Sequence, residues 1–128
     1  MFQLSQTSYN RLKGIDQRLI DIVTMAIITS PIDFGIPQDG GLRTVERQKE
    51  LFDLKKSKCD GYKNKSYHQS GRAFDIYAYV DKKASWDRAH LKTIADHLIL
   101  VAKRDFDINL EWGGNFKGFV DMPHFQIK

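Results

Sequence analysis

The pattern of hydrophobic and polar positions along the chain predicts three helices. Over residues 15–30, apolar residues recur at the i, i+4, i+7 spacing of an amphipathic helix, which Ser30 and Pro31 end. The apolar stripe consists of Leu19, Ile22, Val23, Ala26 and Ile27. A second helix is predicted over residues 44–54 and a third over about 85–103, with Thr44 and Ser85 as their N-caps.

Strand-like segments are concentrated in the second half of the chain. Residues 73–80 (AFDIYAYV) alternate with a period of two, which predicts a strand with Phe74 and Ile76 on one face and Asp75 on the other. Two further strands are predicted around 108–112 and 124–127, separated by a glycine-rich segment. Helices early and strands late favour an α+β fold, a small antiparallel β-sheet packed against about three helices.

Two polar segments interrupt this pattern. The turn QDGG at 38–41 leads to Arg43, and the stretch 55–66 (KKSKCDGYKNKS) is too polar for a core position, so we expect it to form a surface loop.

Composition narrows the classes of protein that the chain can belong to. With 128 residues and 41% hydrophobic content, residues 1–128 fit one domain with a core of its own. A net charge of +4 indicates a mild preference for anionic partners, and we expect no nucleic-acid partner. The single cysteine, Cys59, cannot form an internal disulfide.

The chain carries no signal for membrane insertion or assembly. No window approaches the roughly 20 apolar residues of a membrane span, and the first residues lack the apolar run of a signal peptide. We therefore expect a protein that is made in the cytoplasm, and a monomer is the default because nothing indicates an oligomer.

The segment SYHQSGRAFD (66–75) places His68 seven residues ahead of Asp75. Asp75 lies in a segment predicted to be buried, where a carboxylate is costly unless a cation or several donors compensate its charge. That partner is either a metal ion or an arginine, for which Arg43 and Arg72 are the candidates.

The segment VDMPHFQ (120–126) supplies a second histidine and carboxylate. Pro123 disfavours a helix here and indicates an extended entry to the last strand, with His124 and Gln126 projecting from one side. Two histidines and one carboxylate make the ligand set that leaves an open position on a catalytic zinc ion. A further carboxylate would act as the base, and spacing alone allows either Asp75 or Asp121 to take that role. Trp112 is a candidate cleft wall or an ordinary core residue.

Together these residues resemble a known enzyme family. The pattern SxHxxGxAxD, formed here by Ser66, His68, Gly71, Ala73 and Asp75, and the later DxPH, formed by Asp121, Pro123 and His124, are similar to the motifs of the zinc D-alanyl-D-alanine carboxypeptidase and L-alanyl-D-glutamate endopeptidase family of peptidoglycan hydrolases. The segments 30–48 and 111–126 extend the resemblance, the latter especially to single-domain bacteriophage endolysins.

The resemblance implies a role for each of these residues. His68, Asp75 and His124 would be the zinc ligands and Asp121 the catalytic base. Arg43 would bind a substrate carboxylate or the polarised carbonyl, and Ser66 would orient a neighbouring group. The implied fold is a single domain with a zinc cleft.

The implied activity is hydrolysis of the L-alanyl-D-glutamate bond in the peptide stem of peptidoglycan. Such an endolysin would be made in the host cytoplasm and act in the periplasm on the cell wall after release. Two alternatives stay open: a D-Ala-D-Ala carboxypeptidase or dipeptidase in cell-wall remodelling, and a non-enzymatic module that binds an anionic polymer around a structural metal.

Overall fold

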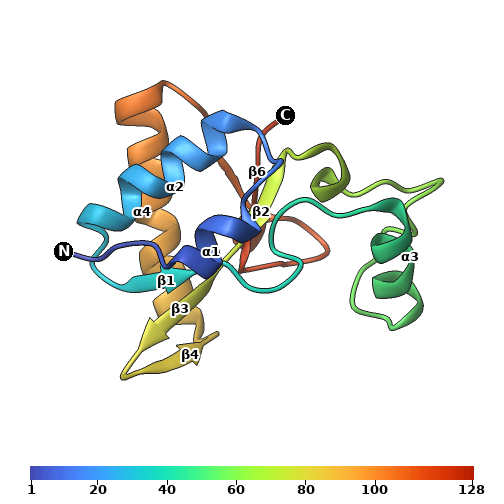
Figure 1. The fold of residues 1–128 in the computed structure, drawn as a ribbon, viewed down its shortest axis with the longest axis horizontal. Coiled ribbons are helices and arrows are strands. Elements are labelled where there is room, and N and C mark those ends of the chain that lie inside the picture. Colours follow the sequence, from blue (N-terminus) through green and yellow to red (C-terminus); the bar gives the residue numbers. More distant parts are fainter.

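Four α-helices and six short strands make up the structure, a computed structural model that describes residues 1–128 (Figure 1). The helices are α1 (Gln6–Arg11), α2 (Gln17–Thr29), α3 (Val45–Asp53) and α4 (Arg88–Phe106). The strands are β1 (Asp33–Gly35), β2 (Ala73–Asp75), β3 (Tyr77–Val80), β4 (Lys83–Ser85), β5 (Glu111–Trp112) and β6 (His124–Gln126). Two 3₁₀ turns, η1 (Tyr67–Ser70) and η2 (Gly113–Asn115), complete the fold. The mixed α+β class predicted from the sequence is confirmed.

Side-chain caps set the starts of α2 and α3. The carboxylate of Asp16 accepts a hydrogen bond from the Arg18 amide at the start of α2, and Thr44 caps α3 as predicted. The predicted apolar stripe of α2 is buried. Helix α1 was not predicted, because six residues are too few to show a helical period.

Helix α4 begins later than the sequence pattern suggested. Asp87 is its N-cap and accepts from the amides of Ala89 and His90, whereas the predicted cap, Ser85, ends strand β4. A carboxylate that accepts from two free amides at the positive end of a helix is a strong cap. Trp86 therefore lies outside the helix and is 57% exposed.

The single strand predicted over 73–80 is wrong, because the chain changes sheets at Ile76. The amide of Ile76 donates to the carbonyl of Pro123 at 3.0 Å, in register with the pairing of β2 and β6, but Pro123 has no N–H to donate in return, so that ladder ends there. Strand β2 pairs with β6, and β3 pairs with β1 and β4, which gives two antiparallel sheets ordered β2-β6-β5 and β1-β3-β4. The predicted alternation survives the break, since Phe74 and Ile76 are fully buried. The strand predicted over 108–112 is only Glu111–Trp112.

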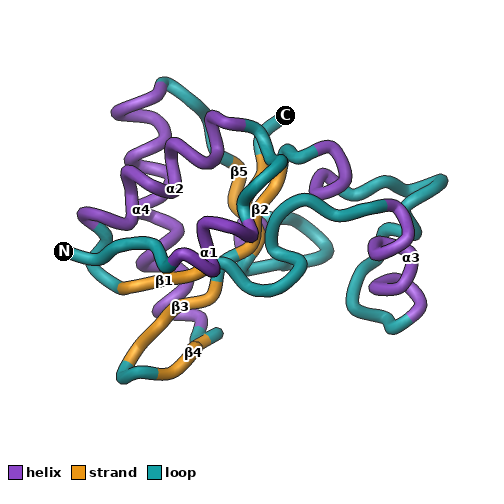
Figure 2. The backbone as a smooth tube through the Cα atoms, viewed as in Figure 1, coloured by secondary structure: helices purple, strands orange, loops and turns teal.

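A single hydrophobic cluster joins helices α2 and α4 to both sheets. Helices α2 and α4 lie side by side, and Figure 1 places them on one side of β2 and β6, with α3 on the other. Figure 2 shows that long loops flank α3, so this second side of the molecule is built largely of loop. None of the helices combines the length and apolar character that crossing a bilayer requires.

Candidate metal centre

Strands β2 and β6 bring the two predicted motifs together. Their antiparallel register pairs Asp75 directly with His124, so the last residue of one strand faces the first residue of the other. Directly paired residues on antiparallel strands have neighbouring side chains on the same face. The pairing of β2 with β6 thus gives the site its first carboxylate and its first imidazole.

His68 reaches the same place from the 3₁₀ turn η1. Ser66 and Gln69 form a capping box at the start of this turn, in which the Ser66 hydroxyl accepts from the His68 amide. The imidazole is 2% exposed, and its Nδ1 atom lies 2.9 Å from the carbonyl oxygen of Gly41. Gly41 has to be glycine, because a Cβ atom there would lie 2.0 Å from the carbonyl oxygen of Arg11. The turn before Arg43 therefore forms the floor beneath His68.

Three ligand-type atoms form a nearly equilateral triangle. The Nε2 atom of His68 lies 3.2 Å from Oδ1 of Asp75 and 3.2 Å from Nδ1 of His124, and the third side measures 3.1 Å. Ligands at about 2.0–2.1 Å from a tetrahedral ion are about 3.3 Å apart, so the triangle matches three corners of such a site. The structure thus contains a candidate metal site formed by His68, Asp75 and His124.

The outer nitrogen of each imidazole is fixed by an oxygen acceptor. The Nδ1 atom of His68 donates to the Gly41 carbonyl. The Nε2 atom of His124 lies 2.7 Å from the Oε1 atom of Gln126. The Gln126 amide nitrogen donates to Glu111, so the Gln126 oxygen must face the imidazole and accept a hydrogen bond from it. In the neutral rings the inner nitrogens then carry lone pairs, and three acceptors converge. A divalent metal ion at the centre would supply the positive charge that such a cluster needs.

Arg43 orients Asp75 through a hydrogen bond to the second carboxylate oxygen, which lies outside the triangle. The Nη2 atom of Arg43 donates to Oδ2 at 3.2 Å, while its other donors bind the Asp39 carbonyl and the Gln48 side chain. Burial alone would raise the pKa of Asp75, but when the imidazoles are protonated, the charge of His68 and the hydrogen bonds that both rings donate outweigh burial and hold this pKa well below its ordinary value. The carboxyl group is therefore ionised at neutral pH, the state in which it binds a metal.

The other arginine considered for Asp75, Arg72, lies elsewhere. Its guanidinium stacks on the Tyr67 ring, 4.4 Å from the ring centroid.

The pKa of His124 is shifted in two directions. Burial would lower this pKa, but the hydrogen bond with Asp75 and the charge of that carboxylate raise it above its ordinary value.

Asp121 lines the same cleft without belonging to the triangle. The Asp121 amide donates to the carbonyl of Gly113. A Cβ atom at position 113 would lie 2.1 Å from the Asp121 carbonyl oxygen, so only glycine at this position lets the two segments come so close. Burial and the nearby charge of Asp75 raise the pKa of Asp121 above its ordinary value. A raised pKa makes the carboxylate a stronger base, as proton transfer at neutral pH requires.

The cleft above the triangle has a volume of about 370 Å³. Ser66 and Arg43 line it, as their predicted roles require, but Trp112 does not. Trp112 is buried in the core and donates through its indole nitrogen to the carbonyl of Met122, which fixes the segment that carries Asp121. The structure thus places Trp112 behind the site and not in its wall.

Sequence reasoning missed several residues that line the cleft. They are Lys56, Ser57, Lys58, Cys59, Lys65, Tyr67, Phe116, Phe119 and Gln126. The Phe116 ring lies 6.0 Å from the His124 ring between centroids and is one of the aromatic side chains of the wall. The available signal was the pair of phenylalanines three apart in an otherwise glycine-rich, polar loop.

The fold and the site define a small α+β protein with a candidate catalytic metal centre in an open cleft. Residues 1–126 match the model of the phage L-alanyl-D-glutamate peptidase family. The chain belongs to this family.

Two individual proteins show the same relationship. The crystal structure of the Serratia marcescens L-Ala D-Glu endopeptidase ChiX superposes with a TM-score of 0.86 at 29% identity, covering 99% of this chain and 90% of that one. The L-alanyl-D-glutamate peptidase of Listeria phage A118 is 36% identical over 63 residues, which are 49% of this chain. The match spans only 21% of that longer relative.

Proposed function

We propose that the chain is a peptidoglycan hydrolase that cleaves the amide bond between L-alanine and D-glutamate in the peptide stem, with Zn²⁺ as its metal. The observation that carries this proposal is the convergence of His68, Asp75 and His124 in the cleft that Asp121 also lines. Membership of a family named for this bond supports the choice of substrate.

Two imidazoles and one carboxylate are a ligand set of catalytic zinc sites. A zinc ion held there would polarise the scissile carbonyl and lower the pKa of a water molecule toward about 7. Asp121 takes the proton of the attacking water on its carboxylate and delivers it to the leaving amine nitrogen. Arg43 keeps Asp75 oriented, and Gln126 keeps the lone pair of His124 directed inward.

The alternatives receive less support. The family and both relatives are named for cleavage between L-alanine and D-glutamate, not for release of terminal D-alanine. A structural metal site would be closed by four protein ligands, whereas the cluster here has three.

The proposed substrate sets the place of action. An enzyme of this kind would be made in the cytoplasm of the host cell and reach the wall in the periplasm after release. Fractionation of cells that express the protein, before and after permeabilisation of the inner membrane, tests this: wall degradation is expected only afterwards.

Mass spectrometry of digested peptidoglycan tests the reaction itself. Purified sacculi are incubated with the protein as prepared, after removal of metal by a chelator, and after restoration of Zn²⁺. We expect new L-alanine carboxyl ends and D-glutamate amino ends in the first and third samples only. Release of D-alanine without those ends would instead support a carboxypeptidase, and an unchanged digest would reject hydrolysis.

A further inference from the structure

One wall of the cleft carries an excess of positive charge that the proposed chemistry does not use. Lys56, Lys58 and Lys65 line the cleft from the loop 55–66, and Arg43 lines it from the segment before α3. Only two carboxylates, Asp75 and Asp121, share this lining with the four cations. A cleft lined by one sign of charge concentrates ligands of the opposite sign.

The loop that carries these lysines is held in place from beneath. Gln48 is fully buried, and its amide nitrogen donates to the Ser57 hydroxyl at 2.8 Å and to the Cys59 carbonyl at 2.7 Å. Farther along, the Gln69 amide nitrogen donates to the carbonyl of Gly61 at 2.9 Å. Buried amides with satisfied hydrogen bonds fix a backbone geometry, so the lysines occupy a defined wall of the cleft.

None of the three lysines has an anionic partner within the protein. Lys49, Lys92 and Lys103 each pair with an aspartate four residues later, whereas Lys56, Lys58 and Lys65 form no ion pair. The Nζ atom of Lys58 lies 4.6 Å from the centroid of the Phe119 ring, on the opposite loop of the cleft. These ammonium groups are therefore available to a ligand in the cleft.

Arg43 is less available than the lysines. Three of its five N–H groups already bind Asp39, Gln48 and Asp75. Arg43 thus orients a metal ligand with part of its donors, and the three lysines are the cations of the cleft that pair with no carboxylate of the protein.

The proposed substrate carries the complementary charge. Glutamate has two carboxyl groups, and because a linear peptide uses one of them for the next bond, the other stays free beside the scissile amide. The stem also ends in a carboxylate. We infer that Lys56, Lys58 and Lys65 form a carboxylate-binding wall that makes the cleft selective for stem peptides with free carboxylates; this inference rests on the proposed function.

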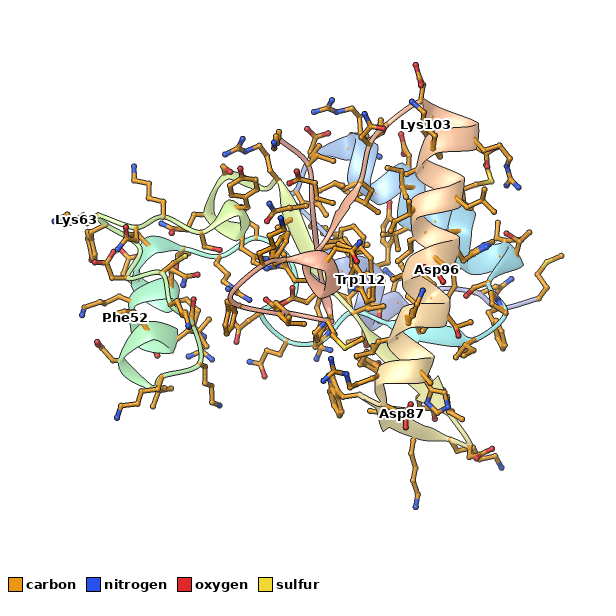
Figure 3. The ribbon with its side chains drawn as sticks, turned by 180° about the vertical axis from the view of Figure 1, so that it is seen from behind. Phe52, Lys63, Asp87, Asp96, Lys103 and Trp112 are labelled. Atoms are coloured by element: carbon orange, nitrogen blue, oxygen red, sulfur yellow. The ribbon has the colours of Figure 1, made fainter.

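Three synthetic stem peptides distinguish the two sources of that carboxylate: the free acid, a peptide amidated at the spare carboxyl group of D-glutamate, and one amidated at the C-terminus. The test variant replaces Lys56, Lys58 and Lys65 with glutamine. The matched control is Lys63→Gln in the same loop, because Lys63 does not line the cleft and lies at the outer tip of the loop in Figure 3.

We expect the triple variant to raise KM for the free acid roughly tenfold with kcat changed less than about twofold, since exposed ion pairs are individually weak and contribute to binding. The control should leave both constants unchanged. The peptide amidated at the recognised carboxyl group should show a high KM with the wild-type protein and no further increase with the triple variant. Equal KM values for all three peptides would overturn the inference.

Equilibrium binding separates this inference from the proposed reaction. Isothermal titration of the same peptides into Asp121→Asn protein, and into that protein with the three lysines replaced, measures recognition whether or not the bond is cleaved. Preference for the free acid that disappears with the lysines supports the wall even if no hydrolysis is found. The lysine substitutions could instead slow hydrolysis of intact sacculi without changing the binding of soluble peptides. That result would mean that the lysines attach the protein to the anionic polymer outside the cleft, and it would overturn the inference.

Discussion

The Nε2 atom of His68 lies 3.2 Å from the Nδ1 atom of His124, although 56 positions separate the two residues in the sequence. Their outer nitrogens face the oxygens of Gly41 and Gln126, so both rings turn a lone pair toward the same point. Two histidines that only pack together would not both need to direct a lone pair to one point, so this orientation indicates a preorganised metal site. The first prediction tests whether His68 is a ligand of that site.

His68→Ala should lose its bound metal, because one corner of the triangle is removed and the remaining two ligands hold zinc weakly. The zinc content of purified protein, measured by elemental analysis, should fall from about one ion per chain toward zero, and hydrolysis should fall in step. His90→Ala, on α4 beside Ser85, is the matched control and should keep its metal. Full zinc occupancy in His68→Ala would remove His68 from the ligand set.

Asp121→Asn should keep zinc and fold but slow hydrolysis by about two orders of magnitude or more, because general-base catalysis typically contributes 10²–10⁴-fold. Asparagine preserves the shape of the side chain and cannot accept a proton at neutral pH. Turnover of a stem peptide, zinc content and thermal unfolding should be measured on the same preparation. Near-normal turnover would assign the base to another residue.

Arg43→Lys should weaken zinc binding by about 10–100-fold, a typical effect of removing a partner that orients a metal ligand. Lysine keeps the positive charge but cannot bind Asp39, Gln48 and Asp75 simultaneously. Competition against a fluorescent zinc chelator gives the affinity. Arg72→Lys is the control, since Arg72 stacks on Tyr67 and makes no contact with Asp75. Equal affinities in the two variants would show that Arg43 does not position Asp75.

Gln126→Leu should also weaken zinc binding, because the Nε2–H group of His124 loses its acceptor and the ring is no longer fixed in one tautomer. Gln126→Glu, combined with Glu111→Gln so that two carboxylates do not face each other, retains an acceptor at the same distance along the side chain and should bind zinc more tightly than the leucine variant. The same chelator competition measures both. A leucine variant with wild-type affinity would mean that β6 alone orients His124.

The ion pair between Asp39 and Arg47 should make stability depend on pH. Arg47 donates to both carboxylate oxygens at 3.0 and 2.8 Å, and this hydrogen bonding lowers the pKa of Asp39. A lowered pKa in the folded state contributes stability that is present above the unfolded value of about 3.9 and is lost as pH falls through the folded value.

Asp39→Asn should therefore lower the free energy of unfolding by about 1 kcal/mol or less at neutral pH, because both side chains are partly exposed. Asparagine accepts the positive φ of this position, 65°, so the change isolates the charge. Denaturant unfolding at pH 7 and near pH 3 should show the difference shrinking in acid. A difference that stays constant over this range would exclude the ion pair as its cause.

Local sequence signals predicted three of the four helices, α2, α3 and α4, and the ligand motifs. The stripe of α2 and the cap at Thr44 depend only on neighbouring residues, so they could be identified directly. Alternation along a strand likewise placed Asp75 on the face opposite the buried Phe74. The motifs then supplied His68 and His124, which the structure brings to the same point.

What the sequence did not predict depends on distant partners. The ladder of β2 and β6 ends where Ile76 lies opposite Pro123, which has no N–H to donate in return, and the fixed loop of lysines follows from the buried Gln48. A single sequence gives no register between such segments. For the same reason Trp112 could be proposed as a cleft wall when its actual partner is the carbonyl of Met122.

The division of the chain into two sheets at Ile76 has a practical use. The hairpin of β3 and β4 turns at Asp81 and Lys82, which are exposed and lie in the sheet that carries no metal ligand. Figure 1 shows this hairpin projecting away from β2 and β6. Exposed hairpin tips tolerate insertions well. An affinity tag or a fluorescent reporter placed there would let the protein be tracked or immobilised while its cleft stays free.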